Sequence, residues 1–195
     1  MAVHEVRFPI TDPAEILKLR AGDEVVVQGH IIGIRDRTQI RIFDEGVEPP
    51  MDLGGGFLLH TAPGVRKLED GRYEKVCIGT TTSARMVRFT EGLGERYGVR
   101  AICGKGGFPD EAIEPMHRLG MVYFAIVGGA AALETTQIEE IEEVLWEELM
   151  PECLWKFRVK DFGPLTVGID AHGNSLYHDV QTAATKKLEE LYARL

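Results

Sequence analysis

Short apolar runs alternate with amphipathic segments through the middle of the chain. Such runs are typical of buried strands, whereas apolar residues spaced three and four apart are typical of helices. The pattern predicts strands over residues 57–60, 75–78, 99–103 and 121–127, and helices over 82–97 and 109–117. Strands that alternate with helices indicate a parallel layer with right-handed crossovers. We therefore expect an α/β fold with a mixed sheet and flanking helices.

The flanking segments predict further elements around this layer. We expect strands over 3–10, 154–159 and 165–169, a turn at 161–164, a short helix capped by Thr11 or Asp12, and helices over 38–47, 128–133 and 179–195. β-Branched residues and glycines over 24–34 predict paired strands with bends or bulges. Residues 138–149 have the apolar spacing of an amphipathic helix, but β-branched residues at the start leave a strand possible.

The composition fits a single domain over residues 1–195. An apolar content of 44% in 195 residues is enough for a real core, and the formal charge of −9 argues against a nucleic-acid partner. The first residues do not resemble a signal peptide, and no stretch is long and apolar enough for a membrane span. Cys77, Cys103 and Cys153 are odd in number and lack metal-type spacing. We expect them to be buried and reduced, with no metal site in this chain and a cytoplasmic location.

A run of hydroxyl side chains follows Gly79 and leads into a predicted helix. We call residues 79–85, Gly-Thr-Thr-Thr-Ser-Ala-Arg, the hydroxyl-rich turn. The start of a helix offers unpaired N–H groups and the positive end of the helix dipole, which together stabilise a bound anion. Arg85 follows Thr81 by one turn, so both side chains can face the same bound oxygen atoms. The turn therefore predicts an anion site.

Three basic residues lie where predicted strands end or helices begin. Arg35, Arg85 and Lys105 converge on one pocket if the strands are parallel, because ligands collect at the carboxyl ends of such strands. Two arginines and a lysine beside hydroxyl groups suit a small di- or polycarboxylate. The alternative is three unrelated surface ion pairs. Lys105 lies between two glycines, which allow the backbone to approach a ligand closely. His172 could act as an acid or base, but its sequence surroundings indicate a tight turn first.

Five stretches together resemble the β subunit of the iron–sulfur hydro-lyases, the family of class I fumarases and L-tartrate dehydratases. They are the hydroxyl-rich turn with Met86, Gly-Lys-Gly-Gly at 104–107, Val-Gly-Gly-Ala-Ala-Ala at 127–132, Trp-Glu-Glu-Leu-Met-Pro-Glu at 146–152, and Ile-Asp-Ala-His-Gly-Asn-Ser-Leu at 169–176. The resemblance runs over nearly the whole chain, and the five stretches occur in the same order as in the family. It implies a swivelling β/β/α domain, equivalent to the C-terminal domain of single-chain class I fumarases.

The same resemblance implies a partner and a cofactor. In this family an oxygen-sensitive 4Fe-4S cluster is bound by three cysteines of a separate, larger α subunit, and one iron is open to the substrate as a Lewis acid. The three cysteines of this chain do not resemble those ligands. We therefore expect a hetero-oligomer in which this chain closes the pocket from the other side and binds a small dicarboxylate.

Residue roles can be transferred where the motifs match. Thr81 resembles the proposed catalytic base, and Arg85 and Lys105 resemble the residues that bind the substrate carboxylate and stabilise charge. Further substrate contacts are expected from Arg35, Thr80, Thr82, Ser83 and Gly104. A threonine hydroxyl is a very weak acid, so Thr81 needs nearby positive charge to act as a base.

Some positions depart from the family, and the substrate stays open. Thr80 replaces a common proline, Gln39 replaces a usual histidine, and His60 replaces a frequent tyrosine.

The first hypothesis for the function is the β subunit of a fumarate hydratase that reversibly forms (S)-malate. L-tartrate dehydratase is the nearest alternative, because residues 158–165 resemble that branch at least as well. A non-catalytic, carboxylate-binding regulatory module is the alternative from another class.

Overall fold

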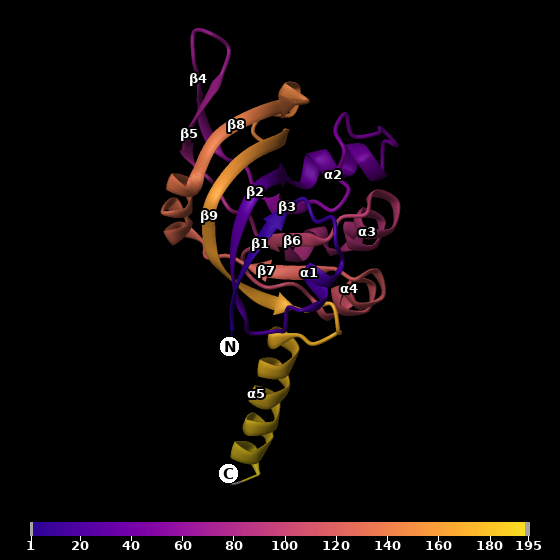
Figure 1. Ribbon diagram of the computed structural model, residues 1–195. Coiled ribbons are helices and arrows are strands. Elements are labelled where there is room, and N and C mark those ends of the chain that lie inside the picture. The colour runs from indigo at the N-terminus through magenta and orange to yellow at the C-terminus, as the bar shows by residue number, and fades with distance from the viewer. Residues whose placement is uncertain (1, 194–195) are drawn as a thin grey trace.

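A seven-stranded mixed sheet forms the centre of the computed structural model, which describes residues 2–193 (Figure 1). Its strands are β1 (Val3–Phe8), β2 (Glu24–Ile34), β3 (Phe57–His60), β6 (Ala101–Gly104), β7 (Val122–Ala125), β8 (Ile138–Leu145) and β9 (Leu154–Ile169), and a separate hairpin consists of β4 (Gly64–Lys67) and β5 (Tyr73–Cys77). The helices are α1 (Ala14–Leu17), α2 (Asp36–Phe43), α3 (Thr90–Tyr97), α4 (Ile113–Leu119) and α5 (Leu176–Tyr192). Short 3₁₀ turns cover η1 (Ala84–Phe89), η2 (Asp110–Ala112), η3 (Gly129–Ala132), η4 (Glu134–Gln137) and η5 (Glu147–Leu149).

The sheet closes partly on itself. Its order is β1-β2-β3-β6-β7-β9-β8, and β9 also pairs with β2. Strands β1, β2, β3, β6 and β7 run parallel to one another, whereas β9 is antiparallel to β2, β7 and β8. This confirms the predicted α/β fold with a mixed sheet and flanking helices. The partial barrel is consistent with a swivelling β/β/α domain.

Two apolar clusters pack on the two faces of the sheet. Phe57, Phe124 and Phe162 are fully buried inside the partial barrel, where the rings of Phe57 and Phe124 stack with centroids 5.6 Å apart. On the other face α2, α3 and α4 cover the sheet, and Leu93 and Met116 are fully buried there. Because these apolar faces are removed from water on both sides of the sheet, the strand ends are held in fixed positions.

Three strand predictions need correction. The segment 24–34 is one strand rather than a pair, and its predicted bulges appear as register shifts against β9. The expected turn at 161–164 lies inside the continuous strand β9, where positive φ angles at Asp161 and Gly163 bend the chain without reversing it. Residues 138–145 form the strand β8, so the helical alternative is wrong. Cross-strand pairing with β9 outweighs the helical spacing there.

Several helix predictions also need correction. The expected helix over 82–97 begins as the 3₁₀ turn η1 at Ala84 and becomes α-helical only from Thr90. The helix expected over 128–133 is only the 3₁₀ turn η3, and the one expected over 38–47 is α2, which starts and ends earlier. Helix α5 starts before the predicted position 179, and residues 194–195 of that prediction lie outside the described residues.

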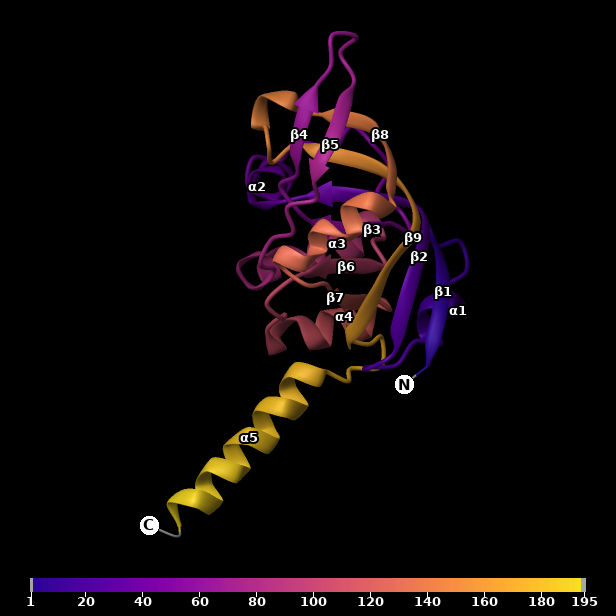
Figure 2. The same cartoon turned by 90° about the vertical axis from the view of Figure 1, so that its left-hand side faces the viewer.

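Two elements extend away from the rest of the molecule. The hairpin of β4 and β5 extends at one end, and α5 extends at the other (Figure 2). Within residues 2–193, no helix is long and apolar enough to cross a membrane.

Candidate functional site

The carboxyl ends of the parallel strands carry several of the predicted residues. Arg35 follows β2 directly, His60 ends β3, and Lys105 follows β6. Strands β2, β3 and β6 are consecutive neighbours and run in the same direction, so their ends lie along one edge of the sheet. This is the edge of the sheet at which the sequence predicts the candidate site.

The hydroxyl-rich turn inserts between two of these strand ends. The backbone N–H of Thr81 donates to the carbonyl of His60 at 2.8 Å, and the N–H of Lys105 donates to the carbonyl of Thr81 at 3.1 Å. The N–H of Ser83 then donates to the carbonyl of Lys105, also at 3.1 Å. These bonds hold Thr81 and Lys105 side by side, in the manner of a short additional strand.

This arrangement corrects the predicted anion site at a helix start. The amides of Thr81 and Ser83 are already bonded to strand ends, and the segment that follows Ser83 is a 3₁₀ turn rather than an α-helix. Thr80 is also engaged, because its hydroxyl donates to the carbonyl of Val127 at 3.0 Å. The amides of Thr81 and Ser83 and the hydroxyl of Thr80 are therefore already occupied.

Arg35 and Arg85 share one carboxylate, that of Asp36. The Nε and a terminal nitrogen of Arg85 donate to the two oxygens of Asp36, each at 2.7 Å, and Arg35 Nε lies 3.2 Å from Asp36 Oδ2. Arg35 also lies 3.7 Å from Glu152 Oε1. Burial raises the pKa of Asp36, but the hydrogen bonds from Arg85 outweigh this effect, so its pKa is lower than usual. The two arginines therefore form one cluster rather than unrelated ion pairs.

Asp36 is a residue for which the sequence predicts no role. Asp36 is the first residue of α2, and its side chain connects α2 to the hydroxyl-rich turn through Arg85. The only signal in the sequence was its position beside Arg35, and an adjacent Arg-Asp pair is too common to indicate a bridge to a residue 49 positions away.

Lys105 differs from both arginines in its surroundings. Within residues 2–193, no carboxylate lies within ion-pair distance of its ammonium group. A hollow of about 190 Å³ lies beside it. The hollow is lined by Cys77, Ile78, Gly79, Thr80, Lys105, Gly128, Gly129, Ala131 and Ala132. A positive charge beside a hollow is a suitable receptor for a carboxylate. Arg85 is not among the residues that line this hollow. It is linked to Lys105 through Thr82, whose carbonyl accepts a hydrogen bond from Arg85 at 3.2 Å and whose backbone pairs with Lys105.

Ser83 and Gly104 lie behind the turn. Ser83 is fully buried, and its hydroxyl oxygen is 2.9 Å from His60 Nδ1 and 3.0 Å from the hydroxyl of Tyr123. A Cβ atom at Gly104 would lie only 2.0 Å from the oxygen of Ser83. Position 104 therefore requires glycine, because any side chain there would displace Ser83. Local sequence patterns do not indicate the contacts of Ser83 with His60 and Tyr123, which join the turn to two separate strands.

The cysteines do not fit a cluster site. Cys103 and Cys153 are buried, as predicted, but Cys77 on β5 is exposed, which corrects the expectation for that residue. Across the described part of the chain, no group of three or more His, Cys, Asp or Glu residues is arranged to hold a metal ion. An iron–sulfur cluster requires several converging thiolates, so the residues described here do not supply its ligands.

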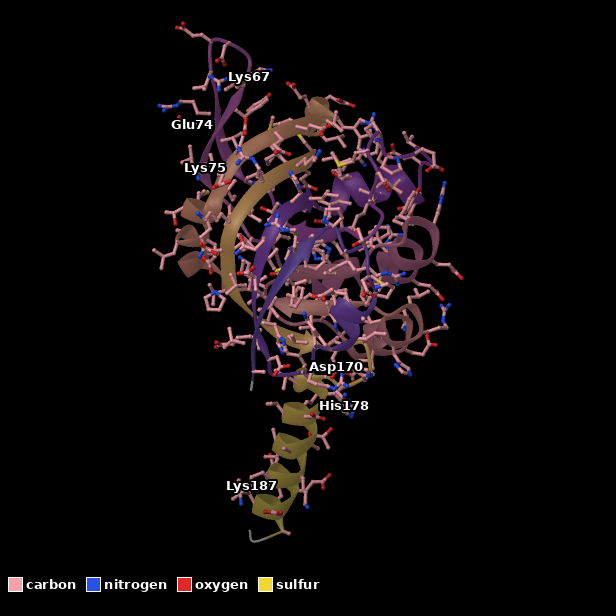
Figure 3. All side chains as sticks on the ribbon, viewed as in Figure 1. Lys67, Glu74, Lys75, Asp170, His178 and Lys187 are labelled. Carbon is pink, nitrogen blue, oxygen red and sulfur yellow. The ribbon has the colours of Figure 1, made fainter. Side chains whose placement is uncertain are left out.

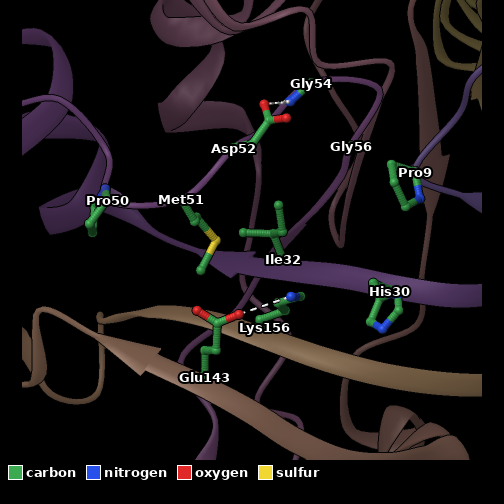
Figure 4. Close-up of a pocket in the computed structure, with 10 residues that line it drawn as sticks. All are labelled: Pro9, His30, Ile32, Pro50, Met51, Asp52, Gly54, Gly56, Glu143 and Lys156. Atoms are coloured by element: carbon green, nitrogen blue, oxygen red, sulfur yellow. Dashed lines mark hydrogen bonds and ion pairs between the residues drawn. The ribbon is translucent and has the colours of Figure 1, made fainter.

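Two other polar regions lie apart from these residues. His172 belongs to the turn 170–174 that leads into α5, and Asp170 lies at this junction (Figure 3). A hollow of about 420 Å³ contains none of the predicted site residues, and its charged side chains are partly neutralised by a 2.9 Å ion pair between Lys156 and Glu143 (Figure 4). The lining residues are Pro9, His30, Ile32, Pro50, Met51, Asp52, Gly54, Gly56, Glu143 and Lys156.

Comparison with known proteins gives consistent matches. A family model described as "Fumarase C-terminus" matches residues 3–180. The L(+)-tartrate dehydratase subunit beta of Escherichia coli K12 is 41% identical over 163 residues, which cover 83% of this chain and 81% of the relative. A putative L(+)-tartrate dehydratase subunit beta of Methanocaldococcus jannaschii is 37% identical over 96% of this chain and 98% of the relative. A putative fumarate hydratase class I of Geobacillus stearothermophilus is 36% identical over 95% of this chain but only 35% of the relative.

Proposed function

This chain belongs to the fumarase C-terminus family, and we propose that it is the β subunit of a hydro-lyase that reversibly hydrates fumarate to (S)-malate. The observation that carries the proposal is the junction between the hydroxyl-rich turn and Lys105, at the carboxyl ends of the parallel strands. A lysine without a carboxylate partner among residues 2–193, two clustered arginines and neighbouring hydroxyls suit a small dicarboxylate.

Each residue has a distinct task in this proposal. Arg35, Arg85 and Lys105 bind the substrate carboxylates and stabilise the negative charge that develops next to them. Thr81 moves the proton at C3 of the substrate, and the neighbouring cations provide the positive charge that its hydroxyl needs. Arg85 exchanges Asp36 for a substrate carboxylate, which offers the same two-point geometry.

The remaining predicted residues shape the same surface. Thr80 and Thr82 border the substrate, whereas Ser83 and Gly104 support the turn from behind. In this arrangement the hydroxyl-rich turn presents Thr81 and the adjacent Lys105 to the substrate, and the buried groups keep the two residues aligned.

The proposal assigns the 4Fe-4S cluster to a larger α subunit in a cytoplasmic hetero-oligomer. Two observations support a second component. The cysteines of this chain do not fit a cluster site, and the tartrate dehydratase relatives are named as β subunits. The chain also spans only 35% of the fumarate hydratase relative, which leaves room there for another domain.

L-tartrate is the second candidate substrate. Relatives named L(+)-tartrate dehydratase subunit beta match this chain at 37–41% identity, against 36% for the fumarate hydratase relative. Both substrates carry two carboxylates, so the same three cations suit either one.

A reconstitution experiment tests the proposal. The chain is co-expressed with a cluster-bearing partner, the complex is reconstituted without oxygen, and fumarate hydration and L-tartrate dehydration are measured. We expect one of the two activities only when both subunits are present. A complex with neither activity would contradict the enzyme proposal and favour a non-catalytic, carboxylate-binding module. Stoichiometric iron–sulfur absorbance in this chain alone would contradict the assignment of the cluster to the partner.

A further inference from the structure

A buried chain of polar side chains lies directly behind the hydroxyl-rich turn. It joins His60 at the end of β3, Ser83 in the turn, and Tyr123 on β7. All three residues are at most 1% exposed. Buried polar groups persist when they are hydrogen-bonded, and a network that links separate elements restricts their relative positions.

The positions of the protons in these hydrogen bonds follow from the geometry. The hydroxyl of Tyr123 lies 2.7 Å from the carbonyl oxygen of Gly104, which can only accept a hydrogen bond. Tyr123 has one proton, and burial raises the pKa of Tyr123 far above its usual value, so the hydroxyl stays protonated and donates to Gly104. The 3.0 Å contact between Tyr123 and Ser83 then requires Ser83 to donate to the phenol oxygen.

This assignment determines the tautomer of His60. Because Ser83 uses its proton on Tyr123, its oxygen must accept the hydrogen bond from His60 Nδ1 at 2.9 Å. His60 is therefore protonated at Nδ1, and Nε2 carries the lone pair. Among the described residues, Nε2 has no hydrogen-bond partner. Burial lowers the pKa of His60 to about 3, and the nearby charges of Asp36 and Arg85 act on the ring in opposite directions, so the ring is neutral near pH 7.

We propose that His60 is a positioning residue that holds the hydroxyl-rich turn in place through Ser83. In this arrangement His60 donates a hydrogen bond to Ser83, Ser83 donates to Tyr123, and Tyr123 donates to the carbonyl of Gly104. The backbone supports the same contact, because the carbonyl of His60 accepts the N–H of Thr81. His60 thus contacts the turn at two points, one on either side of Thr82. The catalytic consequence of this role rests on the proposed function, whereas its structural consequence does not.

The test compares two substitutions at one position. His60→Asn keeps an N–H donor close to the position of Nδ1, whereas His60→Leu keeps a similar volume and removes the donor. Phe162→Leu, in the barrel core, is the control for a general loss of stability. The first measurement is nitrogen NMR of the histidine rings in the full chain. We expect His60 to be protonated at Nδ1 and not to titrate between pH 8 and pH 5; protonation at Nε2, or titration in this range, overturns the proposal.

The second measurement is amide hydrogen exchange at Thr81, Ser83 and Lys105. We expect His60→Leu to accelerate exchange at these three amides by about tenfold, as for the loss of one buried hydrogen bond. We expect His60→Asn to restore it to within about threefold of the original chain on the same grounds. Equal acceleration by His60→Leu and Phe162→Leu at these amides overturns the proposal, because a general loss of stability predicts that result.

The third measurement is made on the reconstituted complex. We expect His60→Leu to lower kcat by about tenfold and to change KM little, His60→Asn to recover most of kcat, and the pH profile to keep its shape. Loss of one limb of the pH profile in His60→Asn would overturn the proposal by making His60 an acid or base. If the unsubstituted complex is inactive, the proposed function fails, and the NMR and exchange results still decide the role of His60.

Discussion

Two polar turns of the molecule look alike in the sequence and differ in their surroundings. The hydroxyl-rich turn and the turn 170–174 are both rich in polar residues and both fixed by hydrogen bonds. In the second turn, Asp170 accepts hydrogen bonds from the backbone N–H groups of Ala21, His172 and Asn174, which use its oxygens fully. In the first, the bonds leave Lys105 beside a hollow.

The two turns lie at opposite ends of the parallel strand β2. Ala21 precedes β2, whereas Arg35 follows it, so the turn 170–174 lies at the amino end of β2 and the hydroxyl-rich turn lies toward its carboxyl end. Dense polar bonding occurs at both ends. At the carboxyl end, Lys105 has no carboxylate partner among residues 2–193 and lies beside a hollow, and this distinguishes the candidate site from the turn 170–174.

Removal of the Lys105 charge gives the largest expected effect. Lys105→Met keeps much of the side-chain volume and removes the positive charge that, in the proposed function, binds a substrate carboxylate. We expect kcat/KM of the reconstituted complex to fall by about 10²–10³, the usual cost of removing one group that stabilises developing charge. Lys160→Met, at an exposed position on β9, is the matched control.

The thermal stability of both variants is measured alongside activity. We expect Lys105→Met to unfold at nearly the same temperature as the unsubstituted chain, because no described carboxylate loses an ion pair. Activity equal to that of Lys160→Met would show that the two polar turns do not differ in function.

Substitution of Arg85 tests whether geometry matters in addition to charge. Arg85→Lys keeps a positive charge but loses the two parallel hydrogen bonds that now hold Asp36. We expect kcat/KM to fall by about 10–100-fold, because lysine cannot reproduce the fork of arginine. Arg88→Lys is the control, since Arg88 makes a similar paired contact with Asp44 farther along the same 3₁₀ turn. Similar losses in both variants would remove Arg85 from the site.

Local patterns in the sequence predicted the strand ends but not the contacts behind them. The apolar runs placed Arg35 and Lys105 correctly after their strands, because a buried strand leaves a strong local signal. The sequence could not reveal that residues 80–83 pair with neighbouring strands, since this pairing depends on how distant segments meet. The bridge from Arg85 to Asp36 and the contact of His60 with Ser83 are likewise long-range, and nothing in local spacing encodes them.

Loss of Asp170 tests the structural turn. Asp170→Ala leaves three backbone N–H groups without their acceptor, so we expect the free energy of unfolding to fall by about 1–3 kcal/mol. Urea denaturation measures this loss, with Asp12→Ala at an exposed position as the control. Activity per folded molecule should stay unchanged. A fall in kcat of tenfold or more in the folded fraction would indicate that this turn also serves the reaction.

The contribution of Asp170 should depend on pH. Burial raises the pKa of Asp170, but the hydrogen bonds from Asn174 and the backbone N–H groups outweigh this effect, so its pKa in the folded chain is below the usual 3.8. A lowered pKa in the folded state means that stabilisation is present above the unfolded-state pKa and is lost as the pH falls through the folded-state value. We expect the urea midpoints of the original chain and Asp170→Ala to differ at pH 7 and to converge below about pH 4. A constant difference down to pH 2 would contradict this linkage.

His172→Ala gives the smallest expected effect and separates the two turns most directly. His172 is exposed, and its Nε2 lies 2.8 Å from the carbonyl oxygen of Leu17 and also contacts a terminal nitrogen of Arg20, so the substitution removes only exposed contacts. We expect a loss of less than about 1 kcal/mol in stability and a change of less than about twofold in kcat/KM. Steady-state kinetics from pH 5 to pH 9 provide the measurement. If the substitution removed one limb of the pH profile while stability stayed constant, His172 would be an acid or base of the reaction, and the turn 170–174 would belong to the site.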